Sequence, residues 1–253
     1  MNRPVRPSED LAAPVRGGLF PEISIGPTTL IRGDALMVLR ELEGVADLVV
    51  TDPPYKLTSG GKNSQVMSGK FANHRYDNSG LLMKVVRWED MGGPILRACK
   101  AQADAYVMTN DKNLHAAQTA FLGAGWRFHN LLVWNKISPT RNRWFMKNLE
   151  YSIFLFKGRA RTINMPGSTQ LFTCPRPKDA IHPTQKPVEL LAHYILNSSA
   201  PGDLVLDPFS GSGATLLAAM QTGRRALGIE LDPDMFEASA ARLAREWQLI
   251  SEE

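Results

Sequence analysis

Four consecutive residues, Asp52-Pro53-Pro54-Tyr55, bring together a carboxylate, a stiff backbone and an aromatic ring. Asp52 can accept one N–H of an exocyclic amine and the carbonyl of Pro53 the other, which would localise a lone pair that normally spreads into the base. The prolines fix that carbonyl because each restricts its own φ and the residue before it. Tyr55 offers a face on which a base taken out of a duplex can stack. The four residues favour alkylation of an amino group by positioning and charge stabilisation, although alone they also fit a strand-ending turn.

A glycine-rich segment, FSGSGAT at residues 209–215, is typical of a turn between a buried strand and a helix. Its small residues would let the backbone approach a ligand closely, and the first amides of the helix favour polar or anionic groups. Glu230 ends the next expected strand, 17 residues after Gly213, where a carboxylate can accept ribose hydroxyls. The segment therefore predicts a nucleoside site, the alternative being a structural glycine turn.

The residues around this turn narrow the class of nucleoside. No Gly-Lys-Ser/Thr sequence is present, which excludes ATP hydrolysis through a Walker A loop, and Leu216 stands where a dinucleotide fingerprint has its third glycine. Asp207, just before the turn, would repel a pyrophosphate but suits the ammonium group of a methionine moiety. These residues favour S-adenosylmethionine as the ligand, and NAD or FAD remains an alternative that the missing third glycine weakens.

Alternating strand and helix patterns must position these two segments. Such alternation predicts an α/β fold with a mostly parallel sheet, in which ligands bind at the carboxyl ends of the strands. The region 159–186 is rich in proline and is expected to be irregular. We expect strands at 28–34, 45–55, 104–110, 126–136, 148–158, 202–207 and 225–232, and helices at 35–42, 81–99, 112–123, 188–198, 233–247 and after the glycine turn.

The composition fits a soluble globular chain, with 43% hydrophobic and 21% charged residues. No apolar run is long enough for a membrane span, and the first residues lack the apolar segment of a signal peptide, so a cytoplasmic location is expected. Residues 1–22 are expected to be a flexible arm and 23–253 a single domain. Two cysteines are too few for a disulfide framework or a zinc site, and no metal is expected. Cys99 is expected in the core, and Cys174 lacks an evident activating partner for nucleophilic chemistry.

Two stretches concentrate positive charge, in a chain whose net charge is +4. Residues 56–75 hold four basic residues and no acidic one, and residues 136–161 hold seven basic residues and a single acid, Glu150. Loops 56–80 and 137–181 are therefore candidate regions for DNA contact and target recognition, the alternative being solvated loops. Trp144 fits either DNA contact or the core. The residues expected to contact DNA are Lys56, Lys62, Lys70, Arg75, Lys136, Arg141 and Arg143.

Over most of residues 28–245 the sequence resembles the β class of DNA amino-methyltransferases. TDPPY (51–55) is similar to the catalytic motif of that family, LDPFSGSGAT (206–215) to its S-adenosylmethionine loop, and HPTQKP (182–187) to the motif before that loop. The resemblance implies a Rossmann-like methyltransferase fold, with a seven-stranded, mostly parallel sheet and one antiparallel strand supplied by 126–136 and 148–158. It also implies a cofactor site made of Asp34, Ala35, Asp52, Thr184, Gln185, Lys186, Asp207, Phe209, Gly211, Ser212, Gly213, Thr215, Glu230, Leu231 and Asp232.

The order of the motifs bears on the substrate. The catalytic motif precedes the cofactor loop, which is the β-class order and implies double-stranded DNA as the partner, with a homodimer as a further expectation. In this family Asp at the first motif position favours adenine N6 as the target, and cytosine N4 is the alternative. An RNA or protein-amide methyltransferase, and a non-catalytic DNA-binding module, are the competing hypotheses.

Overall fold

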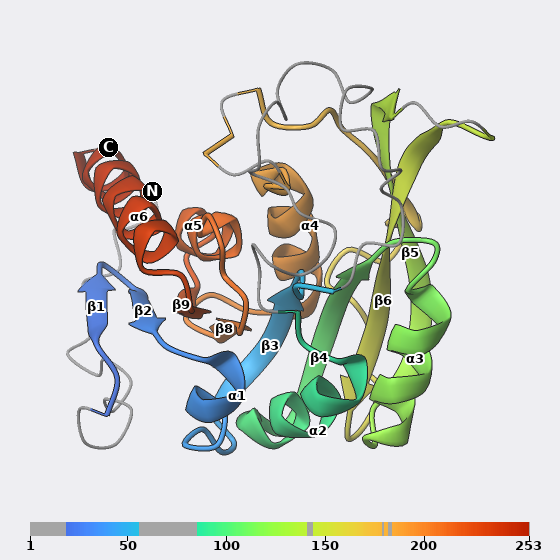
Figure 1. Ribbon diagram of the computed structural model, residues 1–253, viewed down its shortest axis with the longest axis horizontal. Coiled ribbons are helices and arrows are strands. Elements are labelled where there is room, and N and C mark those ends of the chain that lie inside the picture. Colours follow the sequence, from blue (N-terminus) through green and yellow to red (C-terminus); the bar gives the residue numbers. More distant parts are fainter. Residues whose placement is uncertain (1–18, 56–84, 141–143, 179, 182–183, 253) are drawn as a thin grey trace.

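The computed structural model describes residues 19–55, 85–140, 144–178, 180–181 and 184–252, which form one twisted sheet covered by helices on both faces (Figure 1). The described residues contain nine strands in the order β1-β2-β9-β8-β3-β4-β6-β5-β7. The strands are β1 Glu22–Ile25, β2 Thr28–Arg32, β3 Ala46–Thr51, β4 Cys99–Thr109, β5 Arg127–Thr140, β6 Lys147–Lys157, β7 Leu171–Thr173, β8 Leu204–Asp207 and β9 Arg225–Glu230. The helices are α1 Ala35–Val38, α2 Trp88–Ala98, α3 Leu114–Gly123, α4 Val188–Ser198, α5 Ala214–Gln221 and α6 Pro233–Glu252.

The strand directions confirm the predicted α/β architecture. β2, β9, β8, β3 and β4 are mutually parallel, and β6 runs antiparallel to both β4 and β5. The two segments expected at the antiparallel end of the sheet are therefore β5 and β6. The predicted count of seven strands is too low, because β1 forms an antiparallel hairpin with β2 and β7 pairs in parallel with β5. Both extra strands are short edge strands with mostly exposed side chains, so they lack the apolar run that marks the others.

Several element boundaries differ from the predicted ones. The helix expected at 81–99 begins at Trp88 in the described part of the chain, and Cys99 is the first residue of β4 as well as a core residue. The expected 1–22 arm is described from residue 19 onward, and there Phe20 already packs against the core while the Pro21 carbonyl accepts the amide of Arg32. In the described residues no helix has the length and apolar character needed to cross a membrane.

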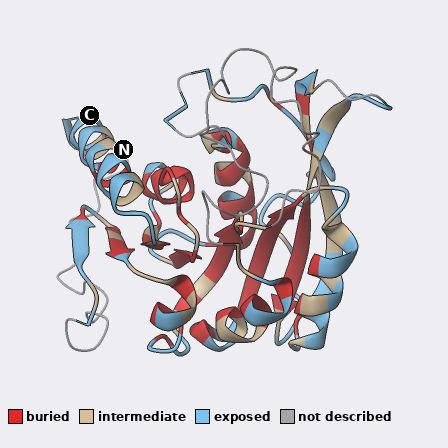
Figure 2. Ribbon diagram, viewed as in Figure 1, coloured by how far each residue is buried: buried red, intermediate tan, exposed pale blue. Residues whose placement is uncertain are grey.

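Alternating strand residues feed two apolar cores, one on each side of the sheet. On one side Val49 and Val107 pack with α1, α2 and α3, and on the other Val50 and Tyr106 pack with α4, α5 and α6. The central strands are consequently buried along most of their length (Figure 2). This burial on both faces fits the near-continuous apolar runs of a parallel sheet and gives the strand ends a rigid base.

The carboxyl ends of four neighbouring strands place acidic residues along one edge. β2, β9, β8 and β3 lie side by side in that order, and they lead to Asp34, Glu230, Asp207 and Asp52 respectively. Thr51 at the end of β3 donates its hydroxyl to Asp207 Oδ1 at 2.8 Å, so the ends of β3 and β8 are in direct contact. Two residues that are 156 positions apart in the sequence therefore share one site on the loop-rich edge of the sheet.

Candidate functional site

The backbone after β3 holds the Asp-Pro-Pro-Tyr segment in a compact turn. The Tyr55 amide donates to the Pro53 carbonyl at 3.0 Å, and the Val86 amide donates to the Pro54 carbonyl at 3.0 Å. The Tyr55 ring stacks on Trp88 at the start of α2, with ring centroids 5.4 Å apart and an interplanar angle of 24°. Trp88 thus fixes one face of Tyr55, a role that the sequence pattern did not reveal.

Asp52 lies in a cluster of alternating charges. The Lys186 ammonium donates to Asp52 Oδ2 and also lies 3.4 Å from Glu150 Oε2, while Lys136 Nζ donates to Glu150 Oε1 at 3.0 Å. The side chains of Lys136 and Lys186 are only 7% and 10% exposed, which makes their pairing with carboxylates necessary. Lys186, predicted to hold the cofactor, is thus a direct partner of Asp52.

The second oxygen of Asp52, Oδ1, is buried and has no hydrogen-bond partner among the described residues. Burial raises the pKa of this carboxyl group, and the neighbouring Lys186 charge opposes that rise. Buried acceptors are nearly always paired in folded proteins, so an open acceptor at the end of β3 marks a place for a ligand donor. An amine N–H is a donor of this kind.

Asp207 is the last residue of β8, and its carboxylate is buried there. Its Oδ1 accepts the Thr51 hydroxyl at 2.8 Å and the Phe209 amide at 3.1 Å. Burial raises the pKa of Asp207 to about 6, against the hydrogen bonds from Thr215, Thr51 and the Phe209 amide. Burial therefore disfavours the ionised carboxylate, and a cation bound next to it would favour the ionised form.

The glycine turn lies between β8 and α5. Gly211 and Gly213 have φ angles of +48° and +71°, and a Cβ on Gly213 would lie 2.3 Å from Ser239 Oγ of α6. Glu230 Oε2 accepts the Gly211 amide at 2.8 Å, so the predicted ribose acceptor also supports the turn. The hydroxyl of Ser210 is buried without a partner among the described residues, a second open polar group that sequence reasoning missed.

Close packing also explains why Leu216 replaces the third glycine of a dinucleotide fingerprint. A Cβ on Gly228 of β9 would lie 2.6 Å from Leu216 Cδ2. The small residue that allows the helix to approach the sheet therefore stands on the strand instead of the helix. The turn itself keeps two glycines, Gly211 and Gly213, both with positive φ angles.

The other predicted cofactor residues lie around the same strand ends. Asp34 caps α1, accepting the Leu36 amide at 2.9 Å, and Ala35 begins that helix. Asp232 donates its amide to Glu230 Oε1 at 2.8 Å. Gln185 Oε1 accepts the Ile181 amide at 3.2 Å. The remaining described members are Thr184, Phe209, Ser212, Thr215 and Leu231, all within the segments that adjoin α4, α5 and β9.

Most of the residues predicted to contact DNA lie outside the described part of the chain. This holds for all of 56–80 and for 141–143, and so for Lys56, Lys62, Lys70, Arg75, Arg141 and Arg143. The region 137–181 is not one continuous loop, because it contains the predicted strand, now β6, and the further strand β7. Its role in DNA contact stays a prediction. Lys136 requires a second correction: its ammonium is buried against Glu150, so we assign it to the charge cluster instead of a DNA-facing surface.

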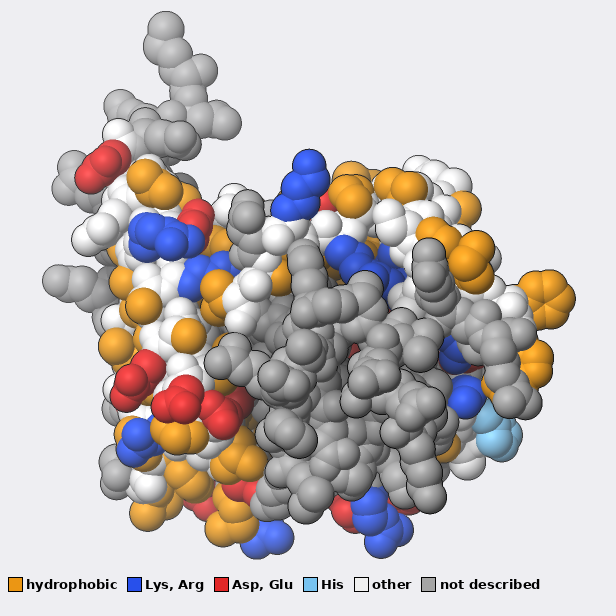
Figure 3. All heavy atoms as spheres, turned by 45° about the horizontal axis from the view of Figure 1, so that its top comes forward, with side chains coloured by type: hydrophobic (Ala, Val, Ile, Leu, Met, Phe, Trp, Pro, Cys, Tyr) orange, Lys and Arg blue, Asp and Glu red, His pale blue; other side chains and the backbone are white. Residues whose placement is uncertain are grey.

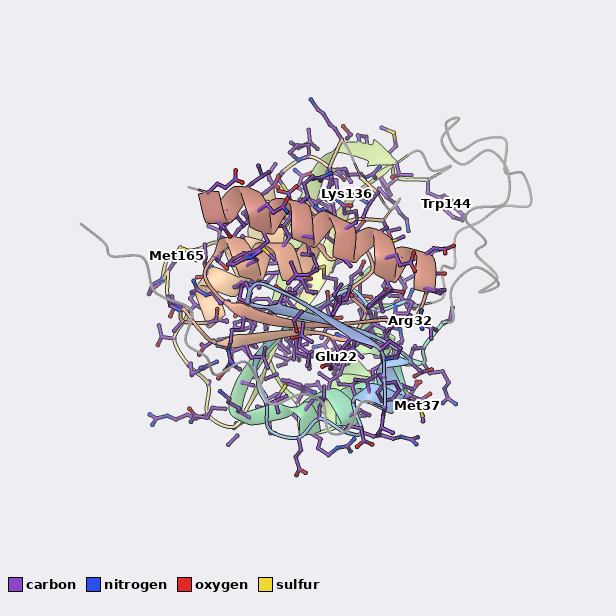
Figure 4. All side chains as sticks on the ribbon, turned by 90° about the vertical axis from the view of Figure 1, so that its left-hand side faces the viewer. Glu22, Arg32, Met37, Lys136, Trp144 and Met165 are labelled. Atoms are coloured by element: carbon purple, nitrogen blue, oxygen red, sulfur yellow. The ribbon has the colours of Figure 1, made fainter. Side chains whose placement is uncertain are left out.

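The tip of the β5–β6 hairpin exposes apolar side chains. Trp144 and Phe145 are 69% and 94% exposed, which excludes the core position that the sequence allowed for Trp144. They line a hollow of about 300 Å³ together with Lys112 and Lys147. Trp144 lies at the periphery of the molecule in Figure 4, and Figure 3 shows hydrophobic side chains at several places on the face that it presents, including its right-hand margin.

Two further predictions concern cysteine and metal. Cys174 is buried, and burial raises the pKa of its thiol to about 11, which disfavours the thiolate that nucleophilic attack requires. The described residues contain no group of three His, Cys, Asp or Glu side chains arranged to hold a metal ion.

The sequence carries one signal for Glu150. It is the single acidic residue among seven basic ones between residues 136 and 161, which makes it the natural partner for a lysine of that stretch. Thr51 gave no signal, since its contact with Asp207 depends on the adjacency of β3 and β8.

Known proteins resemble this chain over most of its length. A profile of the family described as DNA methylase, the N6 and N4 methyltransferases, matches residues 46–241. The putative methylase YubD of Escherichia coli strain K12 is 29% identical over 216 residues, covering 85% of this chain and 89% of YubD. The type II methyltransferase M2.DpnII of Streptococcus pneumoniae is 26% identical over 251 residues, covering 86% of this chain and 90% of that protein.

Solved structures share the fold. The putative DNA modification methylase TTHA0409 of Thermus thermophilus aligns with a TM-score of 0.60 at 26% identity, covering 85% of this chain and 93% of that one. The M1.HpyAVI–SAM complex aligns with a TM-score of 0.64 at 22% identity, covering 85% and 99%. The cytosine-N4-specific PvuII DNA methyltransferase aligns with a TM-score of 0.67 at 15% identity, covering 90% and 93%. Because the family profile spans about three quarters of its length, the chain belongs to the N6/N4 family of DNA methylases.

Proposed function

We propose that this DNA methylase uses S-adenosylmethionine to methylate the exocyclic N6 of adenine in a base turned out of duplex DNA. The observation that carries the proposal is the Oδ1 of Asp52, buried at the end of β3 and left open by the described residues. Tyr55 is held next to it by stacking on Trp88, and the glycine turn lies at the end of the adjacent strand β8. An amine acceptor, a stacking face and a nucleoside turn thus lie together along one edge.

The residues present fit S-adenosylmethionine. The buried Asp207 carboxylate would be stabilised by a cation, and the buried Ser210 hydroxyl has no partner among the described residues. Both lie beside the glycine turn, which is where polar parts of a ligand would be satisfied. Asp207 would face the methionine ammonium, Glu230 the ribose hydroxyls, and Asp34 the adenine side. Lys186, Thr184 and Gln185 lie toward the methionine end. When bound, the cofactor supplies an electrophilic methyl group on a sulfonium.

The chain's own residues prepare the amine. Asp52 Oδ1 accepts one N–H and the Pro53 carbonyl the other, drawing the lone pair out of the ring and aiming it. Tyr55 stacks on the extruded base, an interaction worth about 1–3 kcal/mol. As the nitrogen takes the methyl group it becomes positively charged, and the Asp52 carboxylate stabilises that charge until one proton passes from the nitrogen to water. The bond from sulfur to the methyl carbon would break with its electron pair left on sulfur, so the spent cofactor would leave as a neutral thioether. The product is a secondary amine, and the enzyme returns to its initial state.

The target base is tested by product analysis. Purified protein is incubated with duplex DNA and S-adenosylmethionine labelled in its methyl group, and the digested nucleosides are identified by mass spectrometry. N6-methyladenine is expected. If the product is N4-methylcytosine instead, the target base is cytosine and the chemistry is still that of the family. Label confined to RNA or protein in parallel incubations, or absent from DNA of diverse sequence, would contradict the proposal.

Asp207 makes cofactor binding sensitive to pH. Because the pKa of Asp207 is raised to about 6, we expect affinity for S-adenosylmethionine to fall as the pH drops below about 6, where the carboxyl group becomes neutral. Calorimetric titration between pH 5 and 8 measures this affinity, and Asp207→Asn should weaken binding and make it less dependent on pH.

The raised pKa of Asp207 also affects folding stability. The ionised carboxylate lowers the free energy of unfolding above about pH 6, and this cost disappears toward pH 4, where the group is protonated. Asp207→Asn should therefore raise the melting temperature more at pH 8 than at pH 5, and equal shifts would contradict this assignment.

The hairpin tip is our proposed contact surface for DNA, because its exposed aromatic side chains adjoin Lys112 and Lys147, the second of which pairs with Asp111 at 2.9 Å. Trp144→Ser or Phe145→Ser should raise KM for duplex DNA about 5-fold or more, as expected when a ring that stacks on bases is lost. Affinity for S-adenosylmethionine should stay unchanged. Leu249→Ser, at a residue on α6 that is also more than half exposed, serves as the matched control. Unchanged KM in both tip variants would remove this surface from the DNA interface.

A further inference from the structure

Four charged side chains form a continuous row across the carboxyl edge of the sheet, in the order Asp52, Lys186, Glu150, Lys136. They come from three separate places: the end of β3, the segment before α4, and the β5–β6 hairpin. Their charges alternate and sum to zero, so the row as a whole buries no net charge. Each inner member has two partners of opposite sign, and such a row can redistribute its contacts at little electrostatic cost.

Lys186 lies between the two carboxylates of this row. Its ammonium donates to Asp52 Oδ2, and Glu150 Oε2 lies 3.4 Å away on its other side. The ammonium donates to Oδ2 and leaves Oδ1 open, but its positive charge lowers the electron density of the whole carboxylate and so weakens Oδ1 as an acceptor. A second anion that takes over part of the Lys186 charge would therefore make the open Oδ1 a stronger acceptor for a substrate amine.

Glu150 is placed and charged so that it can supply this second anion. It lies on β6, opposite Trp134 of β5 in the sheet, and its Oε1 is fixed by Lys136 at 3.0 Å, which leaves Oε2 directed at Lys186. The side chain is 26% exposed. The two lysines hold the pKa of Glu150 below its usual range despite burial, so it stays ionised when Lys186 moves.

We propose that Glu150 is a positioning residue that shares Lys186 with Asp52 and takes the ammonium over when the target amine engages Asp52. Lys136 sets the strength of this pull, because it neutralises part of the Glu150 charge. The inference rests on the proposed function for its role in turnover, whereas the charge coupling itself is a property of the free protein. It assigns to Glu150 a task in the reaction without any contact with the base.

The coupling has a defined sign for each variant. Glu150→Gln removes the second anion, so Lys186 belongs to Asp52 alone and the pKa of Asp52 should fall. Lys136→Met frees Glu150 to draw Lys186 away, so the pKa of Asp52 should rise. Among the described residues, the other ionisable groups that face this row are Asp207 on β8, Tyr55 after β3, Arg176 after β7 and Tyr194 on α4.

The first test uses the free protein. Carbon-13 labelling of aspartate carboxyl groups, with Asp52→Asn to assign the signal, gives the pKa of Asp52 by NMR titration without DNA or cofactor. Opposite shifts, downward in Glu150→Gln and upward in Lys136→Met, are expected. Asp47→Asn is the matched control, since it neutralises a carboxylate paired with Lys100 at the other end of the same strand, and it should leave Asp52 unchanged.

The second test uses turnover. Glu150→Gln should lower kcat for DNA methylation about tenfold, with KM for DNA and affinity for cofactor nearly unchanged, and move the acid limb of the kcat profile to lower pH. Glu150→Asp, which keeps the charge, should recover part of the loss. If wild-type protein leaves DNA unmethylated, the proposed function fails while the NMR result still decides the coupling.

The proposal is overturned by shifts of the same sign in Glu150→Gln and Lys136→Met, or by an Asp52 pKa that does not respond to either. It is also overturned if Glu150→Gln matches wild type in kcat, or if Glu150→Asp is worse than the nearly isosteric Gln variant, since that ranking marks a role in shape alone. Melting temperatures separate loss of folding from these outcomes, and Lys136→Met still provides the test if Glu150→Gln does not fold.

Discussion

Asp52→Ala is expected to abolish methyl transfer, with kcat reduced roughly 10³-fold or more, while affinity for S-adenosylmethionine stays within a few-fold of wild type. In the proposed mechanism, the carboxylate removed is the acceptor for the amine and the group that stabilises charge on nitrogen. The proposed cofactor site lies at the neighbouring strands β8 and β9, which the change leaves in place. Methyl incorporation into DNA and calorimetric binding of the cofactor measure the two effects separately.

The fold should survive this change because Lys186 keeps a carboxylate partner. Glu150 Oε2 lies 3.4 Å from its ammonium, so the variant does not strand a buried cation. Circular dichroism and the melting temperature provide the check. Asp52→Asn is a useful companion variant, since it keeps the shape and loses the charge. Substantial turnover in the Asn variant would show that hydrogen-bond geometry alone suffices, and would contradict the charge-stabilising role assigned to Asp52.

Gly213→Ala is expected to destroy the cofactor site. The residue has a φ of +71°, which costs a residue with a Cβ about 1–2 kcal/mol, and its new Cβ would lie 2.3 Å from Ser239 Oγ. The overpacking adds about 1–3 kcal/mol. The turn must shift to relieve both, so affinity for S-adenosylmethionine should fall at least about tenfold, with a lower melting temperature.

Two further variants isolate these causes. Gly202→Ala has a similar φ of +85° but open space around its Cβ, so it should cost stability without changing cofactor affinity. Gly213→Ala combined with Ser239→Ala removes the closest atom and should recover part of the lost affinity. The Ser239 hydroxyl is buried without a partner among the described residues, so its removal by itself should cost little. No recovery in the double variant would show that the φ angle dominates.

The sequence alone predicted the features that depend on neighbours along the chain. Apolar runs predicted the strands that became β3, β8 and β9, and the glycine pattern predicted the turn before α5. The four motif residues after β3 carry their chemistry in their types and order. Local backbone preference and burial decide all of these, and both are encoded within a few residues.

Only the tertiary structure decided which charges meet. Lys136 reads as a DNA-contacting residue in a basic run, yet pairing of β5 with β6 places it against Glu150 and buries it. Lys186 reads as a cofactor residue, yet it reaches Asp52, 134 positions away in the chain. Strand order determines such contacts, and strand order depends on packing of the whole sheet. The motif after β3 therefore predicted which group accepts the amine, and the fold decided which cation pairs with that group.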